Sequence, residues 1–102
     1  MNLEWTKDLV HEVVEEQRAF FKTGQTLDVD WRIRQLKKLR TAVIAFEDEL
    51  EEALYEDLGR CDTEAYVFDI GDVILEINEA IHGVRKWARP ETHFSGLVCF
   101  QV

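Results

Sequence analysis

The sequence is short of cysteine, glycine, basic residues and long apolar runs, and each shortage excludes a class of protein. Its two cysteines and a start without a leader-like apolar run indicate a reducing compartment rather than a disulfide-stabilised secreted scaffold. Its five glycines never form the G-x-G-x-x-G or phosphate-loop patterns. No stretch approaches the roughly 20 apolar residues that span a bilayer. With 12 basic and 21 acidic residues, the net charge of −9 argues against nucleic acid and anionic membrane surfaces as partners. We expect a cytoplasmic, soluble, single-domain protein.

The stretch from Asp28 to Gly59 is the one around which the rest of the chain is organised. Its apolar residues recur at alternating steps of three and four, which places them on one helix face. These residues are Leu36, Leu39, Val43, Phe46, Leu50 and Ala53. The first half of the stretch is basic and the second half acidic, an order that opposes the dipole of a single helix. A break near Phe46 removes most of that conflict, so we expect two consecutive helices, at about 30–45 and 47–58.

Two further helices are predicted, at about 6–22 and 62–87. The second has the most regular spacing in the chain, an apolar heptad seam. The seam consists of Val67, Ile70, Ile74, Ile77, Ile81, Val84 and Ala88. Gly71 and Gly83 each cost such a helix about 1 kcal/mol relative to alanine. We expect a close-packed neighbour at Gly71 and a bend or fraying at Gly83, and Pro90 ends the helix.

The predicted fold class is therefore all-α, a small antiparallel bundle of three to four helices. The helical region covers residues 1–89, and an extended apolar tail covers 90–102. The seam Val67–Ala88 is expected to pack antiparallel to the face Leu36–Ala53. Apolar faces left over, including Phe20, Phe21, Trp31 and the tail, are expected to meet a second copy, because large exposed apolar patches usually mark interfaces. Oligomerisation would then complete the bundle.

Two side-chain pairs have spacings that occur in metal sites. Glu79 and His82 match the Glu-x-x-His pattern of di-metal helical bundles, but such a site needs a second copy of the pattern and two more inward carboxylates. The sequence contains no second copy, so a solvated acid and a surface histidine are expected. His11 and Glu15 lie one helical turn apart, and a surface contact is expected there as well.

Neither cysteine has the surroundings of a nucleophile. Cys61 lies beside Arg60, which favours a thiolate slightly, but no histidine base is near in sequence. Cys99 reads as a small apolar residue in the tail. The basic run Arg32–Arg40 could contact nucleic acid, yet the acidic run that follows it would repel such a partner. From the residues alone, no catalytic constellation is predicted.

An ordered set of short motifs resembles one enzyme family. The motifs are Arg18-Ala-Phe-Phe, Thr23-Gly24, Arg32-Ile33-x-Gln35-Leu36, Ala53-Leu54-x-x-Asp57-Leu58-Gly59, Glu64-Ala65-Tyr66, Glu76-Ile77 and Lys86-Trp87. In this order, and over roughly Leu9 to Phe100, they resemble the N-terminal region of aldehyde dehydrogenases, most closely the fatty and aromatic aldehyde branch.

The resemblance implies a parent reaction, the oxidation of aldehydes to carboxylic acids with NAD or NADP. In the family a cysteine nucleophile, a general-base glutamate and a glycine-rich cofactor turn perform it, and this chain contains none of the corresponding segments. Neither Cys61 nor Cys99 has the Gly-Gln-x-Cys context of the nucleophile. No catalytic, cofactor-binding or metal-binding residue is therefore assigned, no cofactor is expected in this chain, and the chain alone is expected to be inactive.

Three hypotheses remain open. The chain is a truncated or separately expressed piece of such an enzyme, or a free-standing helical module for self-association or partner binding. The third hypothesis is a carboxylate-rich metal bundle. Under the first two, a homo-oligomer (a dimer or higher) is expected.

Overall fold

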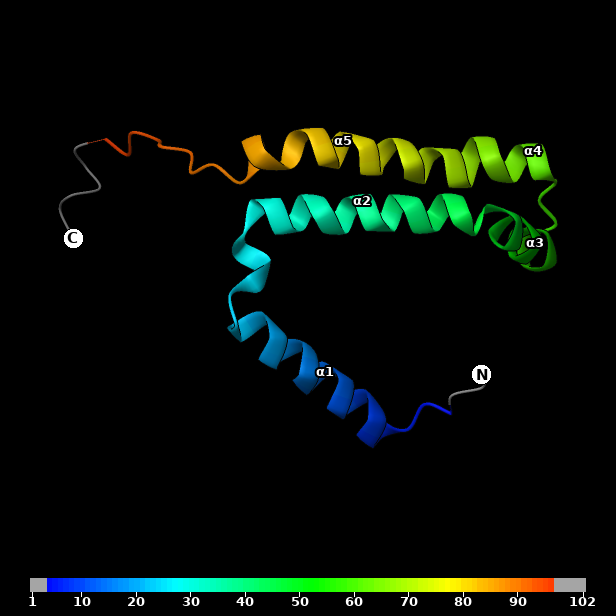
Figure 1. Ribbon diagram of the computed structural model, residues 1–102, viewed down its shortest axis with the longest axis horizontal. Helices are drawn as coiled ribbons and strands as arrows, with labels where there is room; N and C mark the ends of the chain where they lie inside the picture. Colours follow the sequence, from blue (N-terminus) through cyan, green and yellow to red (C-terminus); the bar gives the residue numbers. More distant parts are fainter. Residues whose placement is uncertain (1–3, 97–102) are drawn as a thin grey trace.

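The structure is a computed structural model that describes residues 4–96, and every regular element within that range is helical (Figure 1). This confirms the all-α fold class. The elements are α1 (Lys7–Lys22), the 3-10 turn η1 (Gln25–Leu27), α2 (Val29–Ala45), α3 (Glu47–Leu58), α4 (Asp62–Glu64), the π-helical segment η2 (Ala65–Ile70) and α5 (Gly71–Trp87). None of the helices in residues 4–96 has the length and hydropathy needed to cross a membrane.

Helix α1 has defined ends and stands apart from the other long helices. The Thr6 hydroxyl oxygen accepts a hydrogen bond from the backbone N–H of Leu9 at 3.2 Å, so Thr6 is the N-cap. At the other end Gly24 has φ of 76°, a left-handed conformation that glycine adopts without steric cost. The chain turns there, and α1 diverges from the α2–α5 pair (Figure 1). No residue of α1 is buried.

Helices α2 and α3 meet at Phe46, where the order of charges predicts a break. Phe46 has φ −101° and ψ 18°, outside the helical values. Its N–H still donates to the Ala42 carbonyl at 3.0 Å, and its carbonyl accepts from Leu50 N–H at 2.9 Å. Helix α3 therefore starts directly after α2 but in a new direction (Figure 1). The first turn of α3 is acidic, which suits the positive end of a helix dipole.

The last long helix is not the uninterrupted α-helix that its spacing predicts, because a π-helical segment occupies 65–70. The Gly71 N–H donates to the Tyr66 carbonyl, a hydrogen bond between residues five apart. A Cβ on Gly71 would lie 2.5 Å from that carbonyl oxygen. The close neighbour at Gly71 is thus a backbone group of the same helix. The absence of a side chain at Gly83 leaves room for the Trp87 ring, because a Cβ at Gly83 would lie 2.4 Å from that ring.

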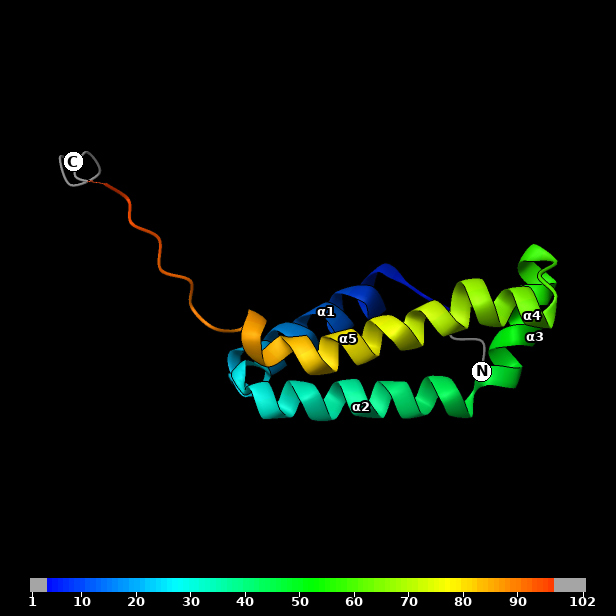
Figure 2. The ribbon, with the colours of Figure 1, turned by 90° about the horizontal axis from the view of Figure 1, so that it is seen from above.

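The core lies between α2 and α5, which run side by side and antiparallel (Figures 1 and 2). Within the described part of the chain, the buried apolar residues are Ala65, Ile70 and Ile77. The predicted pairing of the seam with the first half of the Leu36–Ala53 face is confirmed. The second half of that face belongs to α3, which crosses the end of the pair and packs against η2.

The start of the seam differs from the prediction. Val67 is 51% exposed, whereas Ala65 is fully buried. The π-helical repeat of five puts Ala65, and not Val67, on the same side as Ile70. From Ile74 to Val84 the seam faces α2, with Ile77 buried and Ile74, Ile81 and Val84 half-buried. Ala88, the last residue of the predicted seam, is exposed and follows the end of α5.

The molecule is extended for its size. Its radius of gyration is 20.1 Å, whereas a compact chain of this length has about 13 Å. Part of the extension is the segment 90–96, which leads away from α5 without regular structure (Figure 2). The rest of the predicted apolar tail, 97–102 with Cys99, lies outside the described residues. Several large side chains on the helices are also exposed, among them Phe21 at 66%, Phe46 at 59% and Phe68 at 60%.

Candidate functional site: an apolar groove along the helix pair

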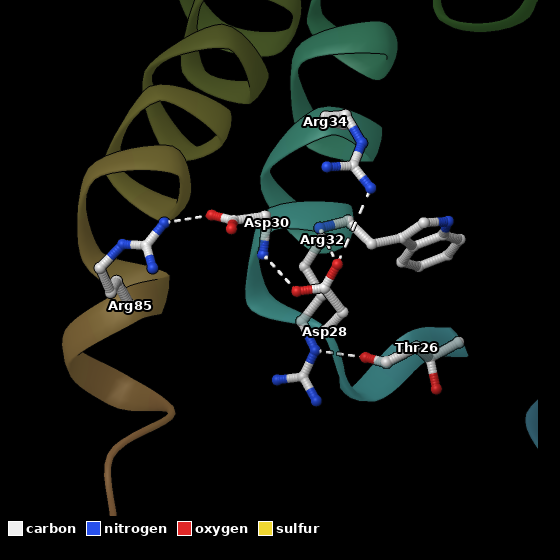
Figure 3. A network of polar contacts seen from close by, with 7 residues as sticks. Thr26, Asp28, Asp30, Arg32, Arg34 and Arg85 are labelled. Carbon is white, nitrogen blue, oxygen red and sulfur yellow. Dashed lines mark hydrogen bonds and ion pairs between the residues drawn. The ribbon is translucent and has the colours of Figure 1, made fainter. Parts of the chain in front are cut away.

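A polar network fixes the junction between η1, α2 and α5 (Figure 3). The Asp28 carboxylate caps α2 by accepting from the N–H groups of Asp30 at 3.2 Å and Trp31 at 3.3 Å. Arg32 Nε donates to the Thr26 carbonyl at 2.5 Å, which ties η1 to α2. Arg85 of α5 donates to the Asp30 carboxylate. The hydrogen bond from Arg85 and the positive charge of Arg85 hold the pKa of Asp30 below its ordinary value.

The basic run Arg32–Arg40 also finds partners within the chain. Arg34 Nη2 lies 3.8 Å from Asp28 Oδ2. Arg40 Nη1 donates to Asn78 Oδ1 at 2.6 Å and so links the middle of α2 to α5. Arg34 thus supports the N-terminal end of α2 and Arg40 supports the α2–α5 contact. The last turn of α2 contains no basic residue, so the run does not balance the helix dipole at that end.

Acidic side chains gather where α3 meets α4, around a hollow of about 420 Å³ that Asp48, Glu51, Glu52, Tyr55 and Asp62 line. Partial burial, followed by the charges of Asp62 and two α3 neighbours, raises the pKa of Glu51. Over residues 4–96, no group of three or more histidine, cysteine or acidic side chains has the geometry to hold a metal ion. The cluster is thus a region of charge repulsion.

The residue pairs singled out in the sequence are not brought together with further functional groups. Glu79 and His82 are both exposed, and His82 Nδ1 lies 2.7 Å from the Asn78 carbonyl of its own helix. Glu15 pairs with Arg18. Cys61 is exposed at the start of α4, and Arg60 beside it is directed to Asp69, with 3.2 Å between Nε and Oδ2.

A hollow lies where α2, α3 and η2 meet. It is open, measures about 510 Å³ and is mostly apolar. Its apolar lining consists of Val43, Leu50, Leu54, Phe68, Ile70 and Val73. Asp69 and Asp72 border it. A second open hollow of about 480 Å³ lies between α2 and the end of α5, lined by Trp31, Arg32, Gln35, Leu36, Leu39 and Val84.

The two hollows open on the same side of the helix pair. Leu36, Leu39 and Val43 are spaced by three and four residues, so they lie on one face of α2. Val73 and Val84 are three helical turns apart and share one face of α5. We call the two hollows, together with the α2 and α5 faces that they share, the apolar groove. The links made by Asn78 and Arg85 lie on another flank of α5.

The chemistry of the apolar groove suits packing against another apolar surface. A small-molecule site combines an apolar lining with a few convergent polar groups. The donors in the lining, Trp31, Arg32 and Gln35, lie at one end of the groove, where Arg32 Nε already donates to the Thr26 carbonyl. The carboxylates of Asp69 and Asp72 border the other end. Sequence analysis predicted the two faces but not their union into one open surface. The signal available was the set of apolar residues off the heptad seam, Phe68 and Val73.

Comparison with known proteins finds relatives that are named aldehyde dehydrogenases. No family model matches the chain. It is 34% identical over 93 residues to 4,4'-diaponeurosporen-aldehyde dehydrogenase of Staphylococcus aureus, which covers 91% of this chain and 20% of that protein. It is 35% identical over 89 residues to aldehyde dehydrogenase family 3 member F1 of Arabidopsis thaliana, covering 87% of this chain and 18% of the relative. It is 35% identical over 82 residues to the dimeric NADP-preferring aldehyde dehydrogenase of Canis lupus familiaris, covering 80% and 18%. The chain thus spans a fifth or less of the length of these relatives.

Proposed function

Because the chain belongs to the aldehyde dehydrogenase superfamily, we propose that it is the N-terminal helical segment of an enzyme that oxidises aldehydes to carboxylic acids with NAD or NADP. The observation that carries the proposal is the identity of 34% over 91% of the chain. An identity of this size over so much of the chain is what a shared segment of one family would have.

The proposed role of the segment is structural. Its open apolar groove is the surface that the rest of the enzyme would cover. Burial of apolar area contributes about 25 cal/mol per Å², so covering both hollows would stabilise the whole protein. The groups that react with the aldehyde and the cofactor would come from the remainder of the enzyme.

Cys61 has no part in the proposed reaction. A cysteine nucleophile needs a base that removes its proton and a donor pair that holds the oxyanion. Arg60, the cation nearest to it in sequence, is directed to Asp69. We therefore propose that the isolated chain neither binds NAD(P) nor oxidises aldehydes.

A segment exchange tests the proposal. The segment of the Staphylococcus aureus relative that aligns with this chain is replaced by this chain. The hybrid is expected to fold and to reduce NAD or NADP in the presence of an aldehyde. Val43→Asp places a carboxylate in the groove and is expected to abolish soluble, active hybrid. Glu56→Gln, on the exposed side of α3, is the matched control and should leave activity unchanged. A hybrid that fails with the unaltered segment, or aldehyde oxidation by the isolated chain, would contradict the proposal.

A second candidate function is a free-standing helical module for binding partners. The observation in its favour is that one chain contains both an open apolar groove and an amphipathic helix, α1, with no buried residue. The segment exchange separates the two candidates. If the chain is a dedicated binding module, the hybrid is expected not to oxidise aldehydes.

A further inference from the structure

Helix α1 is an amphipathic helix without a cover. Its apolar residues form one stripe along the helix: Leu9, Val10, Val13, Val14, Phe20 and Phe21. Val10 is 48% and Phe21 66% exposed. A helix of this kind obtains most of its stability from packing its apolar face, and α1 lacks that packing within one copy.

The apolar groove matches α1 in length and chemistry. Helix α1 has 16 residues and α2, which forms one wall of the groove, has 17. At 1.5 Å per residue both are about 25 Å long. On α2 the apolar lining of the groove runs from Trp31 through Leu36 and Leu39 to Val43, with Arg32 and Gln35 beside Trp31. The lining from Trp31 to Val43 and the α1 stripe from Leu9 to Phe21 each extend over 12 residue steps, about 18 Å, so the stripe fits along this lining.

The connector directs α1 away from the groove of its own chain, and the contact between them is at one end, where Phe20 meets Trp31. Gly24 adopts φ of 76°, and Leu27 N–H donates to its carbonyl at 3.0 Å. Arg32 Nε donates a hydrogen bond to the Thr26 carbonyl, and the rings of Phe20 and Trp31 contact each other with centroids 6.0 Å apart. With these contacts in place, α1 points away from the α2–α5 pair (Figure 1).

We propose that two copies of this chain associate by exchanging α1, so that the α1 helix of each copy packs into the apolar groove of the other. The exchange goes beyond the role proposed above, because it concerns the chain on its own. Each copy has one uncovered helix and one uncovered groove. In a dimer with two-fold symmetry both helices and both grooves are covered, and no surface remains to bind a third copy.

The exposed area is sufficient for such a dimer. The chain exposes 9032 Å², against roughly 6,000 Å² expected for a compact protein of its 12.0 kDa. A stable interface buries about 1,200–2,000 Å² in total over both partners. The excess over a compact chain, about 3,000 Å² per copy, is larger than the area that such an interface needs.

Analytical ultracentrifugation of the full chain tests the proposal through two substitutions at exposed positions. Val10→Asp alters α1, and Leu39→Asp alters the groove at a side chain that is 51% exposed. The unaltered chain is expected at twice 12.0 kDa and each variant at the mass of one copy. The controls Glu12→Gln and Lys37→Gln, outside the two apolar stripes, are expected to remain dimers. Far-UV circular dichroism of the variants verifies that the helices are retained.

Mixing the two variants separates exchange from other modes of association. In a mixed dimer one α1–groove contact carries both substitutions and the other carries neither, so dimers should reappear on mixing. A monomeric unaltered chain would overturn the proposal and favour closure of α1 on its own groove, or a groove reserved for the rest of the enzyme. Dimers that survive either substitution, or variants that stay monomeric after mixing, would overturn it as well.

Discussion

At the scale of single residues, Gly71 determines how the last helix can be built. Its N–H reaches the Tyr66 carbonyl five residues back, and a Cβ would lie 2.5 Å from that oxygen. Replacement of a helical glycine by alanine ordinarily stabilises a helix by about 1 kcal/mol. We predict that Gly71→Ala instead lowers the free energy of unfolding by about 1–3 kcal/mol, the usual cost of overpacking. Urea denaturation measures the change.

Gly83→Ala is the matched comparison in the same helix. The atoms that a Cβ at Gly83 would meet belong to the Trp87 side chain, which is 61% exposed and can swing outward. We expect a change within about 0.5 kcal/mol for this variant, as for other surface substitutions. Stabilisation by Gly71→Ala would contradict the assignment of the π-helical segment.

The ion pair between Asp30 and Arg85 predicts a pH dependence. Because Arg85 lowers the pKa of Asp30 in the folded chain below the ordinary 3.8, the pair contributes stability above that ordinary value. The contribution is lost as the pH falls through the lowered pKa. The difference in melting temperature between the unaltered chain and Asp30→Asn is therefore expected to be largest near neutral pH and to vanish in strong acid. A difference that grows on acidification would contradict the pairing.

Glu51 is predicted to behave in the opposite way. Its pKa is raised by partial burial and by the charges of Asp62, Glu47 and Asp48. An acid with a raised pKa in the folded state destabilises that state when ionised, and protonation relieves the effect. Glu51→Gln is expected to raise the melting temperature at neutral pH. The gain should shrink as the pH falls through the raised pKa, and an equal gain at all pH values would contradict it.

At the scale of elements, the contact between α2 and α5 holds the fold together. Ile77 is 6% exposed and faces α2. Ile77→Ala is predicted to lower the free energy of unfolding by about 2–5 kcal/mol, since it removes buried methyl groups and leaves a cavity. Leu75→Ala changes a side chain that is 66% exposed on the same helix and is the control. Equal effects of the two substitutions in urea denaturation would show that α5 does not pack as described.

The elements also show how far sequence reasoning reaches. The alternation of three and four from Ile70 to Val84 was sufficient to predict the antiparallel pairing of α5 with α2. The reversal of charge at Phe46 predicted the break between α2 and α3, because a helix dipole makes that order unfavourable. The π-helical segment could not be predicted, because the sequence offers an apolar partner for Ile70 in either kind of helix. Val67 precedes Ile70 by three residues, which suits an α-helix, and Ala65 precedes it by five, which suits a π-helix. Val67 was therefore placed on the wrong side of the helix.

At the scale of the whole molecule, the apolar groove depends on tertiary arrangement. Its walls come from α2, α3, η2 and α5, and the direction of α3 after Phe46 decides whether Leu50 and Leu54 face Phe68. Local pattern carries no information on that direction. The stripe of α1 was predictable, but its separation from the helix pair depends on the η1 connector. The family resemblance came from ordered short motifs, which record ancestry and not packing.

A single copy of this chain leaves its apolar groove uncovered, and both the proposed role of the segment and the exchange of α1 depend on that. The most direct test is the urea midpoint of the isolated chain measured over a wide range of protein concentration. Association through the groove stabilises the folded state by mass action, so the midpoint is predicted to rise with concentration and to lose that dependence in Leu39→Asp. A midpoint independent of concentration in the unaltered chain would show that one copy covers its own apolar surface.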